Sequence, residues 1–114
     1  MPLVMVSRSN KLDDGLFQQG MRCLPTIIAE NLNVPENPLA HFAPGDVEIR
    51  LQESPFDVRH RDVEVTIFAT KFEARIHTGE LRTEKMTQEL RSILPNGMTG
   101  FVWLVLVDAF FSTF

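Results

Sequence analysis

The start of the chain carries the residue with the clearest chemical potential. Pro2 directly precedes the apolar run at residues 3–6. If Met1 is removed, the nitrogen of Pro2 becomes a secondary amine on a rigid ring. An α-amine has a pKa of about 8, and desolvation or a neighbouring cation lowers that pKa toward the range of a general base at neutral pH. The alternative is a chance Met-Pro start, in which Pro2 merely begins a strand and its missing N–H costs nothing.

Two cations lie on or beside expected strands. Arg50 alternates with apolar residues, so a second buried sheet face would require it to be paired or to line a site. Pairing with Glu48 or Glu64 is the simpler interpretation. Lys71 follows the third expected strand, where it would lower the pKa of the Pro2 amine by charge repulsion or else remain a surface lysine.

The sequence does not favour a metal site. His41, His60 and His77 are isolated, with no pair at i, i+4 spacing and no cysteine beside them. Cys23 falls on the apolar face of an expected helix, so we interpret it as a core residue rather than a nucleophile. No cofactor is expected either.

Length and composition indicate a single globular domain spanning residues 1–114. The single cysteine permits no intrachain disulfide, which fits a reducing cytoplasm. No basic region precedes the first apolar run, as a signal peptide would require, and the apolar run at 101–107 is too short to span a bilayer. The net charge is −4 with no dense basic stripe, so we expect neither a nucleic-acid partner nor a membrane partner.

Hydrophobic periodicity predicts the order β-α-β-β-α-β. Strands show as apolar runs or as period-two alternation, and helices as apolar residues on one face. A proline at position 25 should kink the first helix. The expected strands are residues 3–6, 47–52, 63–70 and 101–107, and the expected helices are residues 13–32, beginning at Asp13 or Asp14, and residues 78–94.

In such a fold both helices cover one face of a four-stranded mixed sheet, giving a two-layer α/β sandwich. The first and fourth strands are apolar on both faces, and the chain has no third helix to cover the second face. Other copies of the chain are the simplest cover, so a homo-oligomer is expected.

The chain resembles the tautomerase superfamily. The resemblance lies in Met1-Pro2, the apolar strand at residues 3–6, the β-α-β-β-α-β order and the chain length. The family includes 4-oxalocrotonate tautomerase, 5-carboxymethyl-2-hydroxymuconate isomerase, malonate semialdehyde decarboxylase and macrophage migration inhibitory factor. The resemblance implies a homotrimer with active sites between subunits, and Pro2 as the general acid or base for a small keto-enol carboxylic acid.

The resemblance also implies an arginine, before the second helix, that grips the substrate carboxylate. Arg75 resembles it, with the planar fork suited to bidentate carboxylate binding, and otherwise would pair with Glu73 or Glu80 in solvent. The family's glycine is replaced by Ala74, and Arg82 is a rival match.

Two basic residues after the first strand resemble the family more weakly. Lys11 and Arg8 lie near the place where short family members carry another arginine. Phe110, in the aromatic C-terminal segment, would line the proline pocket or pack between subunits. The same fold also supports decarboxylation or hydration, and a binding or assembly module without activity is the alternative from another class.

Overall fold

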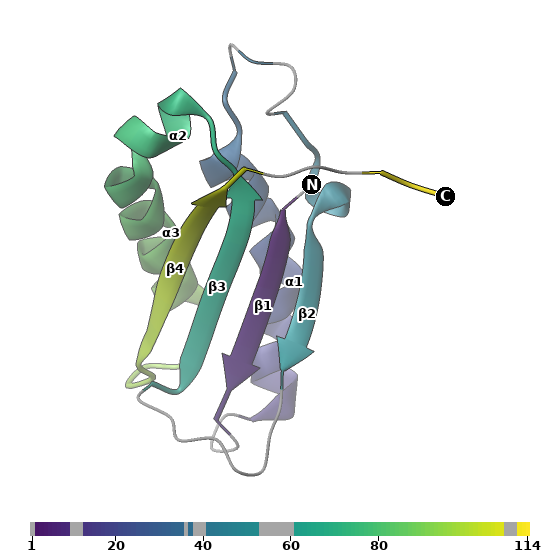
Figure 1. The fold of residues 1–114 in the computed structure, drawn as a ribbon. Helices are drawn as coiled ribbons and strands as arrows, with labels where there is room; N and C mark the ends of the chain where they lie inside the picture. The colour runs from purple at the N-terminus through teal and green to yellow at the C-terminus, as the bar shows by residue number, and fades with distance from the viewer. Residues whose placement is uncertain (1, 10–12, 36, 38–40, 53–60, 109–111) are drawn as a thin grey trace.

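A computed structural model describes residues 2–9, 13–35, 37, 41–52, 61–108 and 112–114. The expected order of strands and main helices is confirmed (Figure 1). Along the chain the elements are β1 (Leu3–Arg8), α1 (Asp14–Leu32), the short 3-10 helix η2 (Pro44–Asp46), β2 (Glu48–Gln52), β3 (Val63–Thr70), α2 (Glu73–His77), α3 (Gly79–Ile93) and β4 (Gly100–Val107).

The four strands form one mixed sheet in the order β2-β1-β3-β4. Strand β1 is parallel to β2 and antiparallel to β3, and β3 is parallel to β4. The apolar start of the chain therefore lies in the middle of the sheet with hydrogen-bonded neighbours on both sides. Strand β1 continues to Arg8, two residues beyond the expected end, because its pairing with β3 extends to Val63.

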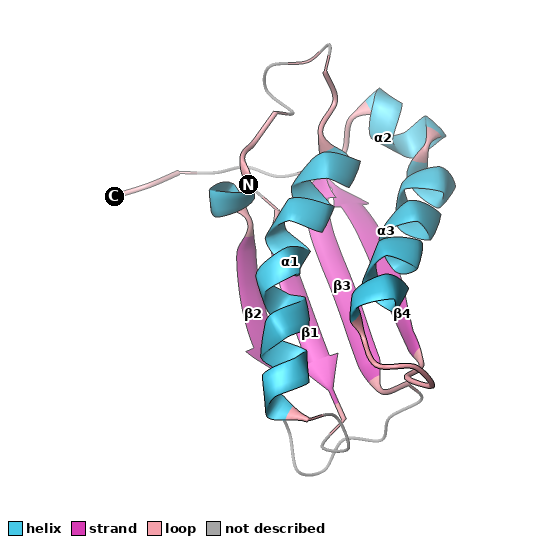
Figure 2. Ribbon diagram, turned by 180° about the vertical axis from the view of Figure 1, so that it is seen from behind, coloured by secondary structure: helices cyan, strands magenta, loops and turns pink. Residues whose placement is uncertain are grey.

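Helices α1 and α3 cover one face of this sheet, which gives the predicted two layers (Figure 2). Alternate residues of β1 and β3 point toward the helices and are almost completely buried, because successive side chains of a strand point to opposite faces. The core between the layers includes Val4, Val6, Val63, Val65 and Ile67 from the sheet, and Leu24, Ile28, Leu32, Met86 and Leu90 from the helices.

Helix α1 begins where the sequence predicts. The Asp13 side chain accepts a hydrogen bond from the Leu16 backbone N–H at 3.1 Å, which caps the first turn. The helix is continuous through Pro25. The interpretation of Cys23 as a core residue is wrong, because Cys23 is exposed. The buried stripe of α1 centres on Leu24 and Ile28, one position away from the cysteine.

The second helical region begins earlier than expected. Instead of one helix over residues 78–94, the chain forms α2 and then α3, with Thr78 between them. The backbone N–H groups of Arg75 and Ile76 both donate to the Phe72 carbonyl, and the Thr78 hydroxyl donates to the Ala74 carbonyl at 2.6 Å. This early turn has too few apolar residues to show as a periodic pattern.

The second face of the sheet is open in a single chain, as predicted from the doubly apolar strands (Figure 1). Trp103 of β4 is 64% exposed there, opposite Thr66 of β3. Leu3 and Met5 of β1 lie on the same face, because Val4 and Val6 point to the helices. The apolar residues of β1 and β4 on this face indicate an interaction surface.

Candidate functional site

Pro2 lies at a fixed and buried position at one end of the sheet. Its carbonyl accepts a hydrogen bond from the Glu48 backbone N–H at 3.2 Å. The next residue, Leu3, pairs with Glu48 of β2 and with Phe68 of β3, so Pro2 is held where β2 begins and β3 ends. A free amine on this residue would be poorly solvated, and burial favours its neutral, basic form.

Lys71 is at the same end of the sheet. It directly follows β3, and its backbone N–H donates to the Val107 carbonyl at 2.9 Å. The end of the sheet where Pro2 lies is therefore also the end where β3 and β4 finish, as Figure 1 shows. Lys71 is exposed, so its ammonium is available to an anionic ligand.

Arg75, in contrast, is buried, with only 3% of its surface exposed. Its Nε donates to the Leu32 carbonyl at 2.9 Å, and its Nη1 donates to the Thr70 carbonyl at 2.9 Å. The guanidinium also lies over the ring of Phe72, 5.0 Å from its centroid, and 5.9 Å from that of Phe42. Arg75 thus joins the end of α1 to the end of β3, and a substrate does not reach it within one copy of the chain.

The charge of Arg75 is retained despite this burial. Desolvation, and then repulsion from Arg82, lower the pKa of Arg75 to about 10, which still leaves it protonated at neutral pH. Among the described residues no carboxylate pairs with it, so carbonyl dipoles and aromatic faces supply the stabilisation. The carbonyl end of α1 carries a partial negative charge, and no basic residue of the helix's own last turn offsets it.

Arg82 also binds carbonyls at the C-terminal end of α1. Its Nη1 donates to the Asn31 carbonyl at 2.6 Å and to the Asn33 carbonyl at 3.3 Å, while its Nε donates to the Thr78 hydroxyl at 2.6 Å. The rival match for the carboxylate-binding arginine is therefore also engaged with backbone. Sequence reasoning missed this pair of contacts. The available signal was a long helix whose last turn has no cation of its own.

Two hydrogen bonds hold the segment between α1 and β2 in place beside Arg75. The Asn33 side-chain amide donates to the Phe42 carbonyl at 3.1 Å, and the Phe42 N–H donates to Asn33 Oδ1 at 2.9 Å. After Phe42 the chain continues through η2 to Glu48, whose backbone N–H donates to the Pro2 carbonyl. Through its contact with the Phe42 ring, Arg75 therefore packs against the segment that leads to the Pro2 end of the sheet.

The remaining candidates lie elsewhere or outside the described residues. Arg50 is exposed on the open face, where its Nε and Nη2 donate to Glu48 Oε1 at 3.1 and 3.0 Å, the pairing considered from the sequence. Arg8 contacts Asp14 near the opposite end of β1 from Pro2. Lys11, His60 and Phe110 fall outside the described residues.

No group of three His, Cys, Asp or Glu side chains among the described residues could hold a metal ion. None of the helices in that part of the chain combines the length and apolar character of a membrane span.

Comparison with solved structures shows the fold shared by tautomerase superfamily proteins. A fused 4-OT symmetric trimer matches with a TM-score of 0.60 and 13% identity over 93% of this chain and 85% of that one. The macrophage migration inhibitory factor-like protein from Entamoeba histolytica gives a TM-score of 0.60, 9% identity, and coverage of 94% and 89%. FG41 malonate semialdehyde decarboxylase gives 0.57, 13%, and coverage of 93% and 83%.

Comparisons by sequence give a different result. No protein-family model matches the chain, and no curated protein matches it. The resemblance stated from the sequence is therefore supported at the level of fold.

Replacement of Arg75 should lower stability. In Arg75→Met the Leu32 and Thr70 carbonyls lose their charged donor, and we expect a loss of about 2–4 kcal/mol in the free energy of unfolding. Arg75→Lys should fall between Arg75→Met and the parent, because it keeps the charge but not the planar fork. Urea unfolding measures the difference. Arg22→Met, at an exposed position of α1, is the control and should stay within about 0.5 kcal/mol of the parent. Equal stability of the two methionine variants would contradict the structural role.

Proposed function

We propose that this chain is a cofactor-independent tautomerase or isomerase of the tautomerase superfamily, acting on small keto-enol carboxylic acids. The observation that carries the proposal is the buried position of Pro2 at the start of the central strand of this fold. The Pro2 amine takes a proton from carbon or from the enol oxygen and returns it to the other atom. This chemistry requires removal of Met1, because an attached Met1 turns the nitrogen into a tertiary amide without basicity.

The cation that meets the substrate carboxylate in this proposal is Lys71. It is exposed at the Pro2 end of the sheet, whereas Arg75 is buried against backbone carbonyls. Arg75 then acts indirectly by ordering the segments around Pro2. Arg50 lies on the open face, so it contributes to a catalytic site only if assembly brings it to the site of another copy. We propose that Phe110 likewise lines the site of another copy.

A second candidate function is a binding or assembly module without activity. The burial of Arg75 favours it, because the arginine that the family resemblance would use for the substrate is engaged in the fold. A related decarboxylase or hydratase remains the third candidate, given the likeness to malonate semialdehyde decarboxylase. The state of the amino terminus and the turnover of defined substrates separate these functions.

The catalytic test uses phenylenolpyruvate and 2-hydroxymuconate ketonisation, with removal of Met1 first verified by mass spectrometry. Pro2→Ala should lower the rate by about 10²–10⁴-fold, the usual contribution of general acid–base catalysis. Lys71→Ala should chiefly raise KM, because a carboxylate contact is present in both ground and transition states. Lys85→Ala, at an exposed position of α3, is the charge-matched control and should leave both constants unchanged.

A rate for Pro2→Ala within a few-fold of the parent would refute the proton-transfer role. A parent with Met1 removed that shows no turnover of either acid would place the binding module first.

We further propose that the chain forms a homotrimer through its open face. Sedimentation at micromolar concentration should give about three times the chain mass of 13.0 kDa. Trp103→Glu should dissociate the assembly, because it places a charge in an apolar interface. Leu81→Glu is the matched control, since Leu81 is similarly exposed, at 66%, but lies on helix α3. A parent that sediments as a monomer, or a Trp103→Glu variant that remains a trimer, would contradict this assembly.

A further inference from the structure

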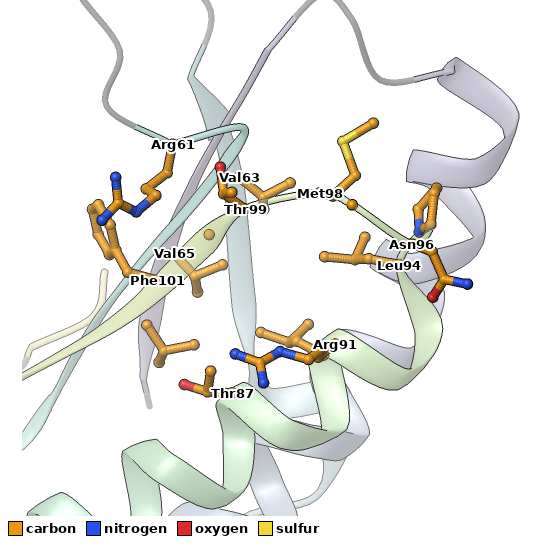
Figure 3. Close-up of a pocket in the computed structure, with 15 residues that line it drawn as sticks. Arg61, Val63, Val65, Thr87, Arg91, Leu94, Asn96, Met98, Thr99 and Phe101 are labelled. Carbon is orange, nitrogen blue, oxygen red and sulfur yellow. The ribbon is translucent and has the colours of Figure 1, made fainter.

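A hollow of about 530 Å³ lies between α3 and the beginnings of β3 and β4 (Figure 3). Its position is at the opposite end of the sheet from Pro2, because Val63 pairs with Arg8 at the end of β1. The volume falls within the range of pockets that hold small molecules. The hollow is therefore separate from the proposed proline site.

The floor of this hollow is apolar. Val63 and Val65 of β3 are at most 2% exposed, and they point toward the helices. The other apolar residues that line it are Leu90, Leu94, Pro95, Met98, Phe101 and Val102. Phe101 pairs with Glu64 and so belongs to the open face, but Val63, Val65 and Val102 belong to the helix-covered side. Assembly through the open face therefore does not by itself fill the hollow.

The charged residues that line the hollow are Arg61 and Arg91, and no described lining residue is acidic. Figure 3 shows the Arg91 side chain extending from α3 into the space between the helix and the strands. The Asp62 carboxylate lies at the rim, where its Oδ2 accepts hydrogen bonds from the Thr99 N–H at 3.0 Å and from the Thr99 hydroxyl at 3.1 Å. Arg91 is exposed and supplies the positive charge between the helix and the strands.

The rim of the hollow is held by the backbone. Gly97 has φ +86°, a conformation that other residues rarely adopt, and it turns the chain after α3. A Cβ on Gly100 would lie 2.7 Å from the Val63 carbonyl oxygen, so only glycine permits this close approach of β4 to β3. The Asp62 and Val63 N–H groups both donate to the Thr99 carbonyl at 3.0 Å. These contacts give the rim its shape in the absence of a ligand.

We propose that this hollow binds a small organic carboxylate with an apolar body. The apolar group contacts the partly exposed side chains of Leu94, Met98 and Val102, and Arg91 binds the carboxylate. An arginine fork suits a carboxylate, and an apolar floor suits an aromatic or aliphatic group. The site does not depend on Pro2, so it is independent of the proposed catalytic function.

The test uses amide NMR of the full-length chain with three probes: naphthylacetate, neutral naphthylacetamide, and acetate. Naphthylacetate should shift the amide signals of Gly97, Thr99 and Gly100 at lower concentrations than those of Lys71 and Val107, which lie at the Pro2 end. Naphthylacetamide lacks the charge, and acetate lacks the apolar body. Each should bind at least about tenfold more weakly, because each loses one of the two contributions.

Two arginine variants complete the design. Arg91→Gln should weaken naphthylacetate binding about tenfold, and Arg22→Gln, which removes the same charge from an exposed position of α1, should not. Pro2→Ala should leave binding unchanged. Shifts confined to the Pro2 end, no binding, equal binding of acid and amide, or equal effects of Arg91→Gln and Arg22→Gln would each overturn the proposal.

Discussion

The position of β1 between β2 and β3 is the constraint on which the rest of the structure depends. Val4 and Val6 have no exposed surface, because the first residues of the chain are also the centre of the sheet. Hydrogen bonds on both sides prevent β1 from shifting without loss of two ladders. Pro2 therefore has one position, and the chemistry proposed for it follows from that position.

A second set of contacts supports the same end of the sheet. Arg75 and Arg82, from two different helices, both donate to carbonyls at the end of α1. They replace the basic last turn that α1 lacks, and Arg75 also binds the last residue of β3 through the Thr70 carbonyl. The cost is the burial of a charge, visible in the lowered pKa of Arg75. The benefit is one cation that joins a helix end, a strand end and the aromatic rings of Phe42 and Phe72.

The sequence predicted what depends on local pattern. The alternation of residues 63–70 and the Asp13 cap gave a strand and a helix start that the structure confirms, and the doubly apolar strands indicated the open face. It did not predict what depends on the packing of distant segments. The burial of Arg75 is decided by carbonyls of α1 and β3, and the exposure of Cys23 by how α1 is rotated on the sheet. The burial of Arg75 leaves no periodic signal, and Cys23 lies directly beside the periodic stripe that α1 buries.

The central claim is that Pro2 carries a buried, weakly basic amine, and the nitrogen chemical shift of Pro2 in the mature protein measures it most directly. Followed across pH, the shift should show a titration with a pKa below about 8, the ordinary value for an α-amine, because burial disfavours the protonated form. A titration at or above that value, or an amide nitrogen that does not titrate because Met1 remains attached, would contradict the account.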